Sequence, residues 1–430
     1  MAKIKPVRAL FYNQERFPDL SKLVCPPYDV ISAEEQDYYH NLSPYNFIHV
    51  LLRKDYPGED KYQKAGVIFR NWIKEKVLLQ NTRPAVYFYS QEYKIKGEKK
   101  RRLGFICLLE LDQRGSNVFG HENTHSFAKK DRLELLRSTN ANLSPIFVVF
   151  QDKKRLIKRI FDHHISSKSK PFIELIDKEG IRHLVWSIEE EKILDFLQKN
   201  MEKEEVFIAD GHHRYEVACL YRDQIRQRLG DKFLEDSSFN YILCYFTNSD
   251  RRGLTILPIH RLVKIEKEEL PLDLFLENLK TYFEIEKIKE KERFLFLIEK
   301  GSLNEHFIGM YKDKRYWLLR IKNLKILEKE MAHLPKEYRL IDAVILDYFV
   351  FNNILRKKLQ KDIVVSYSSS EEELLKAVDN SNDSVAFFLR AVKMEEIMAV
   401  ALKGNKMPAK TTYFYPKVLS GLVIHKHDEI

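Results

Sequence analysis

The sequence predicts a mixed α/β protein, and three features of the pattern support this class. Short apolar runs typical of buried strands alternate with longer segments in which apolar residues recur at helical spacing. Residues 206–209 form such a strand and residues 215–229 such a helix, with a polar turn between them. Beyond residue 264 strands and helices alternate again, which indicates a C-terminal α/β domain of its own.

Chain length supports more than one domain. At 430 residues the chain exceeds the roughly 250–300 residues at which a single core stops growing. A hydrophobic fraction of 44% with 32% charged residues fits a folded protein and not a disordered one. We place the domain boundary near residues 263–266, so that residues 1–263 form the first domain and residues 264–430 the second. The first domain then carries an insertion at about residues 55–200.

Element positions follow from the period of the apolar residues and from capping residues. Ser32 followed by Glu35 predicts a capping box for a helix that runs to about Leu42. The other expected helices are residues 61–79, 152–164, 189–197, 215–229, 270–283, 341–356, 371–378 and 394–402. The expected strands are residues 8–11, 46–52, 85–93, 102–111, 144–150, 172–176, 183–186, 206–209, 241–246, 254–263, 307–310, 316–321, 363–367 and 385–389.

The turn Asp210-Gly211-His212-His213-Arg214 is the main candidate site. A strand-to-helix turn aims backbone N–H groups at a ligand, and the glycine lets that ligand approach closely. Asp210 is placed either to cap the helix or to take part in catalysis. The N-terminal end of a helix dipole favours acidic groups, whereas this turn carries two imidazoles and a guanidinium. Their positive charge there destabilises the fold unless a bound anion compensates for it. We therefore expect this turn to bind phosphate. The alternative is an ordinary turn in which the two histidines merely occupy the first positions of the helix.

Metal binding is a second alternative at the histidines. Adjacent His212 and His213 cannot readily hold one ion from one helix face, where i, i+4 spacing is needed. His121 and Glu122, in a polar cluster between a strand and a helix, could hold a divalent ion, or Glu122 could act as a base. The other interpretation of this cluster is a capped helix start with surface charge.

The turn resembles the Asp-Gly-x-His-Arg signature of the ParB/sulfiredoxin superfamily, which includes free serine kinases, sulfiredoxins and nucleotide-hydrolysing ParB proteins. Over nearly its full length the chain also resembles the family called domain of unknown function 1015. The stretches that carry this second resemblance are Pro26-Pro27-Tyr28-Asp29-Val30-Ile31-Ser32, Asn46-Phe47-Ile48-His49-Val50, His121-Glu122-x-Thr124 with Lys130-Asp131-Arg132-Leu133, Asn142-x-Ser144-Pro145-Ile146-Phe147, the central turn, Leu257-Pro258-x-His260-Arg261, and Met407-Pro408-x-Lys410 through Tyr413-Phe414-Tyr415-Pro416-Lys417 to Gly421-Leu422.

The superfamily resemblance implies a ParB/sulfiredoxin-like N-terminal domain that handles ATP or ADP, with Mg²⁺ as a further cofactor. Gly211 and the backbone after it would hold phosphate, and Arg214 would neutralise developing charge. Asp210 resembles the acid that begins the serine-kinase signature, with Asp29 or Glu122 as base or magnesium ligand.

The resemblance extends to further phosphate ligands and to a substrate. His213 joins the phosphate ligands, and so do two groups outside the turn, namely His260 with Arg261, and Lys410 with Lys417. His212 stands where the kinases have Thr and sulfiredoxin has its reactive Cys, which argues against sulfinic-acid repair and weakens the kinase assignment. Serine or phosphoserine is the most specific substrate that the resemblance implies.

Two functions remain open from the sequence. The first is an enzyme, a small-molecule kinase or phosphatase acting on an anionic metabolite. The second is a non-catalytic regulator of ParB type, in which nucleotide is a switch and the basic surface engages DNA or a protein. The net charge is +10, but basic and acidic residues are interleaved and not massed in one stripe, which argues against nucleic acid. A steep salt dependence of binding would identify a nucleic-acid binder.

The C-terminal stretch, residues 407–422, is expected to fold back over the central turn. Lys410 and Lys417 are phosphate-binding types, and the aromatic run 413–415 is too apolar for a free tail. The alternative is an ordinary edge strand with solvated lysines.

Cellular location and cysteine chemistry are inferred from what the sequence lacks. The N-terminus shows no signal peptide and no stretch has the roughly 18–20 apolar residues of a membrane helix. We therefore expect a cytoplasmic protein that does not enter a membrane. The four cysteines are widely spaced, which indicates neither a zinc site nor a disulfide framework.

Overall fold

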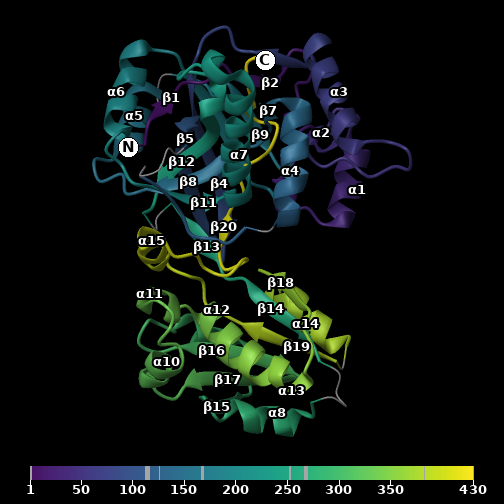
Figure 1. Ribbon diagram of the computed structural model, residues 1–430, viewed down its shortest axis with the longest axis vertical. Coiled ribbons are helices and arrows are strands. Elements are labelled where there is room, and N and C mark those ends of the chain that lie inside the picture. The colour runs from purple at the N-terminus through teal and green to yellow at the C-terminus, as the bar shows by residue number, and fades with distance from the viewer. Residues whose placement is uncertain are drawn as a thin grey trace. The chain divides into compact units, whose positions relative to one another are not determined.

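The computed structural model describes residues 2–111, 117–124, 126–165, 169–250, 253–265, 270–381 and 383–429. The chain forms two compact units (Figure 1). Unit 1 consists of Met1–Gly120, Thr124–Thr255 and Pro416–Ile430, and unit 2 of His121–Asn123 and Ile256–Tyr415. The predicted mixed α/β class is confirmed.

The change from unit 1 to unit 2 falls between Thr255 and Ile256. The join expected near residues 263–266 therefore falls within strand β14 and just after it, and residues 266–269 lie outside the described part. Strands from the expected insertion at 55–200 pair in one sheet with strands outside that range. The final segment from Pro416 onward belongs to unit 1.

Unit 1 is built on one large sheet. Among the described residues nine strands pair in the order β6-β11-β8-β12-β5-β4-β10-β9, with β1 beside β5. β11 is parallel to β6 and β12 is parallel to β8, while the other pairs are antiparallel. The strands are β1 (Ile4–Lys5), β4 (Val86–Ile95), β5 (Glu98–Glu110), β6 (Val118–Gly120), β8 (Ile146–Phe150), β9 (Ile173–Ile176), β10 (Arg182–Ile188), β11 (Val206–Asp210) and β12 (Tyr241–Asn248).

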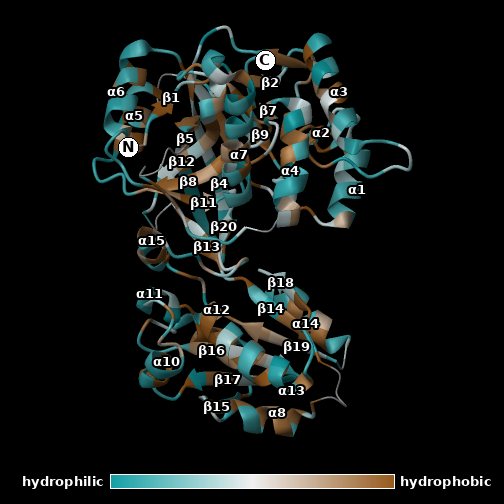
Figure 2. Cartoon of the chain, viewed as in Figure 1, coloured by the Kyte–Doolittle hydropathy of each residue, from teal (hydrophilic) through white to brown (hydrophobic). Residues whose placement is uncertain are grey.

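Helices cover this sheet with amphipathic faces. α5 and α6 pack on the main core of the sheet through residues such as Ile157, Ile160 and Leu197. α4 and α7 meet in a separate apolar cluster that includes Leu136 and Val217. Figure 2 shows the brown apolar strands enclosed by helices whose outer faces are teal. The α-helices of unit 1 are α1 (Ala33–Leu42), α2 (Ile48–Leu51), α3 (Lys61–Lys74), α4 (Ser126–Thr139), α5 (Leu156–Ile160), α6 (Glu191–Met201) and α7 (His212–Leu229).

Small elements complete unit 1. The remaining strand pairs are β2 (Leu10–Tyr12) with β3 (Leu78–Gln80) and β7 (Ala141–Asn142) with β21 (His425–Lys426). The 3₁₀ helices are Leu20–Lys22, Tyr28–Val30, Gly230–Lys232 and Ser238–Asn240, and Phe161–Ile165 is a π-helix.

Several predicted elements need correction. Residues 46–52 were expected as a strand, but Ile48–Leu51 form α2. Two residues before this helix, the Asn46 side chain accepts a hydrogen bond from the Ile48 N–H at 3.0 Å, which favours a turn into the helix over an extended chain. The helix expected over 61–79 ends at Lys74, since Lys76 has a positive φ of 56° and the chain continues into β3. The predicted capping box of Ser32 and Glu35 is present.

Unit 2 is a second sheet with its own helices. Six strands pair antiparallel in the order β15-β17-β16-β19-β14-β18, and β13 pairs with β20 in a small sheet. The strand expected over 254–263 is divided at Pro258, and β15 and α9 were not predicted. The strands are β13 (Thr255–Leu257), β14 (His260–Lys264), β15 (Phe283–Ile288), β16 (Phe307–Lys312), β17 (Arg315–Ile321), β18 (Val365–Ser368), β19 (Ser384–Phe388) and β20 (Tyr413–Tyr415).

The helices of unit 2 pack on this sheet. A core that includes Phe294, Leu374 and Phe388 lies between the sheet and α9 and α14. The helices are α8 (Leu272–Leu279), α9 (Lys291–Glu299), α10 (Leu324–Glu330), α11 (Lys336–Arg339), α12 (Asp342–Ile345), the π-helix Leu346–Arg356, α13 (Lys357–Leu359), α14 (Glu371–Asp379) and α15 (Met394–Leu402). Among all described residues, no helix combines the length and the apolar character that a membrane span requires.

Candidate functional site

The turn between β11 and α7 has a backbone that only glycine adopts readily. Gly211 precedes the first helical residue with φ of 95°, in the left-handed region. A Cβ built on Gly211 would lie 2.8 Å from Cγ2 of Ile146. Glycine is therefore required here for two reasons, the positive φ and the close approach of β8.

Asp210 does not cap the helix; it lies between two cations. Its Oδ2 accepts a hydrogen bond from Nη2 of Arg214 at 2.6 Å, and its Oδ1 accepts one from Nζ of Lys417. Burial alone would raise the pKa of Asp210, but the ion pairs with Lys417 and Arg214 outweigh burial and hold the pKa well below its usual range. The carboxylate is thus ionised near neutral pH, and the three groups together carry one excess positive charge.

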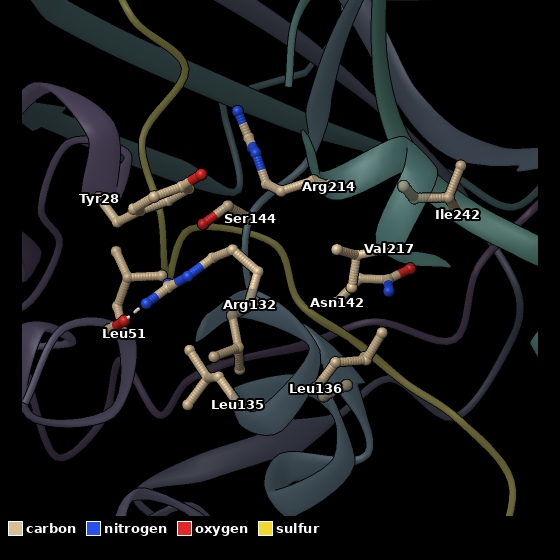
Figure 3. Close-up of a pocket in the computed structure, with 12 residues that line it drawn as sticks. Tyr28, Leu51, Arg132, Leu135, Leu136, Asn142, Ser144, Arg214, Val217 and Ile242 are labelled. Atoms are coloured by element: carbon tan, nitrogen blue, oxygen red, sulfur yellow. Dashed lines mark hydrogen bonds between the residues drawn. The ribbon is translucent and has the colours of Figure 1, made fainter. Parts of the chain in front are cut away.

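Arg214 connects this ion pair to a pocket. Its Nη1 donates to the Pro145 carbonyl oxygen at 2.7 Å, which fixes the plane of the guanidinium. Its Nε is buried and has no hydrogen-bond partner among the residues that the structure describes. The side chain also lines the pocket drawn in Figure 3.

Tyr28 and Arg132 form the polar end of the same pocket. The Arg132 guanidinium lies over the Tyr28 ring, 4.1 Å from its centroid. Burial raises the pKa of Tyr28 to about 12, with Asp29 and Asp210 adding to the rise and Arg132 and Arg214 opposing it. The phenol therefore stays protonated near neutral pH and can donate a hydrogen bond.

The rest of the pocket is mostly aliphatic, with Asn142 and Ser144 as its other polar residues, and its volume is about 60 Å³. In Figure 3 Leu136, Val217 and Ile242 lie on one side, and Tyr28 and the Arg132 guanidinium lie on the other. The complete lining is Tyr28, Leu51, Arg132, Leu135, Leu136, Ala141, Asn142, Leu143, Ser144, Arg214, Val217 and Ile242. All of these residues belong to unit 1.

The two histidines of the turn are buried or half-buried. His212 is 6% exposed, and its ring lies against Gly120, whose ideal Cβ would be 3.3 Å from His212 Cδ2. His213 is half-buried. One turn further along α7, Glu216 accepts a hydrogen bond from Thr124 Oγ1 at 2.6 Å and pairs with Lys129 at 3.2 Å.

Five of the predicted site residues belong to unit 2. His121 Nε2 lies 3.3 Å from Thr412 Oγ1, and Glu122 Oε1 accepts a hydrogen bond from the Lys410 backbone N–H at 2.8 Å. His260 and Arg261 are buried in the unit 2 sheet, at 2% and 1% exposure.

Burial and, secondarily, the neighbouring Arg261 lower the pKa of His260 to about 3. His260 Nδ1 accepts from the Leu389 N–H at 3.2 Å, and Arg261 Nη1 donates to the Ile259 carbonyl oxygen. Neither residue is among the side chains that unit 1 brings to Asp210.

A family model described as "Protein of unknown function (DUF1015)" matches residues 4–344. The chain belongs to the DUF1015 family. No curated protein matches it. This DUF1015 protein is similar to a solved free serine kinase mutant in complex with ADP, with 14% identity over 72% of this chain and 87% of that chain and a TM-score of 0.36.

Two further solved structures are similar to the DUF1015 protein. One is SbnI with a C-terminal truncation from Staphylococcus aureus, with 13% identity over 73% of this chain and 85% of that chain and a TM-score of 0.37. The other is a conserved hypothetical protein from Pyrococcus furiosus, with 14% identity over 73% and 92% of the two chains and a TM-score of 0.35.

Sequence reasoning did not name Tyr28 or Arg132 as site residues of this DUF1015 protein. Arg132 follows Lys129, Lys130 and Asp131, a run that reads as a solvated helix face. In the structure Arg132 is 7% exposed and donates to Asp131 and to the Leu51 carbonyl oxygen. Its position on α4, three and four residues before the buried Leu135 and Leu136, is the signal that could have placed it on the core-facing side.

Proposed function

We propose that this protein is an enzyme that transfers a phosphoryl group from ATP to a small metabolite, with the phosphates bound by Arg214 and Lys417, which Asp210 holds in place. The observation that carries the proposal is one ionised carboxylate held between two cations at a glycine turn that opens a helix. The excess positive charge and the positive end of the α7 dipole both attract an anion.

The chemistry of transfer needs charge stabilisation and a proton acceptor. The acceptor's hydroxyl oxygen forms a bond to the γ-phosphorus, the bond from that phosphorus to the bridging oxygen breaks, and ADP leaves. Arg214 and Lys417 would neutralise the charge that develops on the phosphoryl oxygens. If water takes the acceptor's place, the same step hydrolyses ATP to ADP and inorganic phosphate.

Asp29 is the candidate base for the hydroxyl proton. Its side chain is exposed, and its charge acts on the Tyr28 phenol together with the charges of Arg214 and Asp210. Asp210 does not suit this role, because its two cation partners keep it from accepting a proton near neutral pH.

Magnesium would enter with the nucleotide. Protein sites hold Mg²⁺ with one or two carboxylates and leave the remaining positions to phosphates and water. In the described ranges no group of three or more His, Cys, Asp or Glu side chains is placed to hold a metal. Both Asp210 oxygens already accept from cations, so Asp29 is the carboxylate of this site that could supply a ligand.

Serine is the acceptor that the sequence resemblance implies, and it enters the test below.

The proposal is tested by calorimetric titration of the full-length chain with ADP and with a non-hydrolysable ATP analogue. Arg214→Lys keeps the charge but loses the two-pronged geometry that binds Asp210 and Pro145, so we expect at least a tenfold weaker nucleotide affinity with the fold retained. Phosphoryl transfer is followed as ATP consumed with serine as acceptor.

Arg226→Lys is the matched control, because Arg226 is an exposed residue of the same helix. It should bind nucleotide like the unaltered chain. If Arg214→Lys and Arg226→Lys bind ADP equally well, Arg214 is not a phosphate ligand. If the unaltered chain binds neither nucleotide, the proposed function is wrong.

A further inference from the structure

The pocket beside Arg214 has two chemically different ends. Leu136, Val217 and Ile242 make an aliphatic wall, while the Tyr28 hydroxyl and the side chains of Arg132 and Arg214 supply hydrogen-bond donors at the other end. In the described part of the chain the Tyr28 hydroxyl has no hydrogen-bond partner, and its pKa of about 12 keeps it protonated. A ligand that satisfies both ends is an amphiphile with an anionic head.

The two other polar residues of the lining are already engaged. Asn142 Oδ1 accepts from the Leu243 N–H at 3.0 Å, and its Nδ2 lies 3.3 Å from His427 Nε2. Ser144 Oγ lies 2.6 Å from Ser420 Oγ. A nucleobase buried here would leave its ring nitrogens and amino group without partners, which is unfavourable. An aliphatic group has no such requirement.

Pocket size limits the aliphatic group. A volume of about 60 Å³ exceeds the roughly 10–15 Å³ that one water needs, yet it is small for a long chain. A water cluster would find few hydrogen-bond partners on the aliphatic wall, so a short branched alkyl group fits this space better.

The position of the pocket connects it to the phosphate site. The Arg214 side chain lines the pocket and also pairs with Asp210, which in turn pairs with Lys417. A molecule in the pocket therefore lies beside the residues to which we assign the phosphates. Arg132 retains N–H donors beyond the three that it directs to Asp131 and Leu51.

We propose that the phosphoryl acceptor of this enzyme is a small hydroxy acid with a short branched aliphatic chain. This inference rests on the proposed function. The alkyl chain occupies the wall of Leu136, Val217 and Ile242, and the carboxylate accepts from Tyr28 and from the two arginines. The acceptor's hydroxyl oxygen bonds to the γ-phosphorus, its proton leaves to Asp29, and ADP departs with the electron pair of the broken P–O bond.

The test uses the full chain and three acids. 2-Hydroxy-4-methylpentanoate and lactate share an α-hydroxy carboxylate head and differ in the alkyl chain, and serine is the hydroxy amino acid that the sequence resemblance implies. Binding is measured by calorimetry in the presence of ADP, and transfer by consumption of ATP. Because each buried CH₂ adds about 0.8 kcal/mol, we expect 2-hydroxy-4-methylpentanoate to bind at least tenfold more tightly than lactate or serine.

Two variants locate the binding. Val217→Ile places one more carbon in the pocket, so the preference for 2-hydroxy-4-methylpentanoate over lactate should fall at least fivefold while ADP affinity is unchanged. Tyr28→Phe removes the hydroxyl and keeps the ring under Arg132, so all three acids should bind more weakly by a similar factor. Ile225→Leu is the control, because Ile225 lies on the same helix and in the same apolar cluster but not in the pocket.

The outcomes separate this inference from the proposed function. If the unaltered chain does not bind ADP, the proposed function is wrong. Normal ADP binding with no preference for 2-hydroxy-4-methylpentanoate, or a preference that Val217→Ile and Ile225→Leu change equally, would overturn the acceptor class alone.

Discussion

Asp210 shows how its surroundings decide what a carboxylate can do. An isolated buried carboxylate would take up a proton, but Arg214 and Lys417 on its two oxygens favour the charged form. The residue therefore holds the two cations in place and does not act as a base. Replacing it would leave two cations in a buried site without their counter-ion.

We predict that Asp210→Asn lowers the free energy of unfolding by about 3–5 kcal/mol at pH 7, the usual cost of breaking a buried ion pair. The pKa of Asp210 is lower in the folded chain than the roughly 3.9 of an unfolded one. Its stabilising contribution is therefore present above about pH 4 and is lost as the pH falls further towards the folded pKa.

Urea unfolding of the two proteins from pH 7 to pH 3 measures this effect. The difference in free energy of unfolding between the unaltered chain and Asp210→Asn should become smaller below about pH 4. Asp195→Asn, at an exposed position, should show a small difference at every pH. A difference for Asp210→Asn that stays constant down to pH 3 would contradict the assignment of the ion pairs.

The residues of this site were predictable to different degrees. Asp210 and Arg214 stand four residues apart, and their turn identifies them in the sequence. Lys417 was expected near this turn, but its pairing with Asp210 depends on a contact across 207 residues. Arg132 was missed because charge pattern alone does not reveal burial. Long-range packing decides both cases.

At the scale of elements, the β11–α7 turn joins the sheet to the site. A bulge in the pairing of β11 with β8 lies between Ile208 and Asp210, directly before Gly211. The bulge and the positive φ of Gly211 together direct Asp210 towards Arg214 instead of continuing the strand.

We predict that Gly211→Ala destabilises the chain by about 2 kcal/mol or more, since an alanine there meets both an unfavourable φ and Ile146. Gly180→Ala is the matched control, because Gly180 has φ of 77° with nothing within 4 Å of its ideal Cβ. Only the backbone effect, about 1 kcal/mol, is expected there. Thermal unfolding measures both variants. If Gly211→Ala and Gly180→Ala lose the same stability, the contact with β8 is unimportant.

Elements with strong local signals were predictable, and those decided by tertiary packing were not. The capping box of Ser32 and Glu35 marks the start of α1 in the sequence and in the structure. The short apolar run 46–52 fits a strand or a helix equally well, and the bonds of Asn46 to Ile48 and to the Lys22 carbonyl oxygen select the helix. β15 was missed although its first four residues alternate between apolar and charged as in a strand, because the helix predicted over 270–283 extends into its first residue.

At the scale of the whole chain, the C-terminal segment returns to complete unit 1. Ile424 exchanges backbone hydrogen bonds with Leu10, and β21 pairs with β7. Leu422, Val423 and Ile424 are at most 2% exposed. Residues 418–427 are thus core of unit 1, and a cut before Met407 should unfold this unit.

The same segment carries a histidine that must stay neutral. His427 Nδ1 lies 3.2 Å from the Ser238 carbonyl oxygen, and His427 Nε2 lies 3.3 Å from the Asn142 amide nitrogen. The Asn142 oxygen already accepts from Leu243, so its nitrogen faces the imidazole as a donor. His427 therefore donates from Nδ1 and accepts at Nε2, which only the neutral ring can do.

Acid should therefore loosen unit 1 through this segment. Burial lowers the pKa of His427 well below its usual value and lowers that of His425 to about 4. Both histidines take up protons more readily when unfolded, at about pH 6.5, so the free energy of unfolding should fall as the pH is lowered from about 6.5 to about 4. His427→Gln should make this dependence shallower, and His164→Gln, at an exposed position, should leave it unchanged. The measurement is urea unfolding at half-unit pH steps, and an identical slope for the unaltered chain and both variants would show that His427 is not the group that titrates.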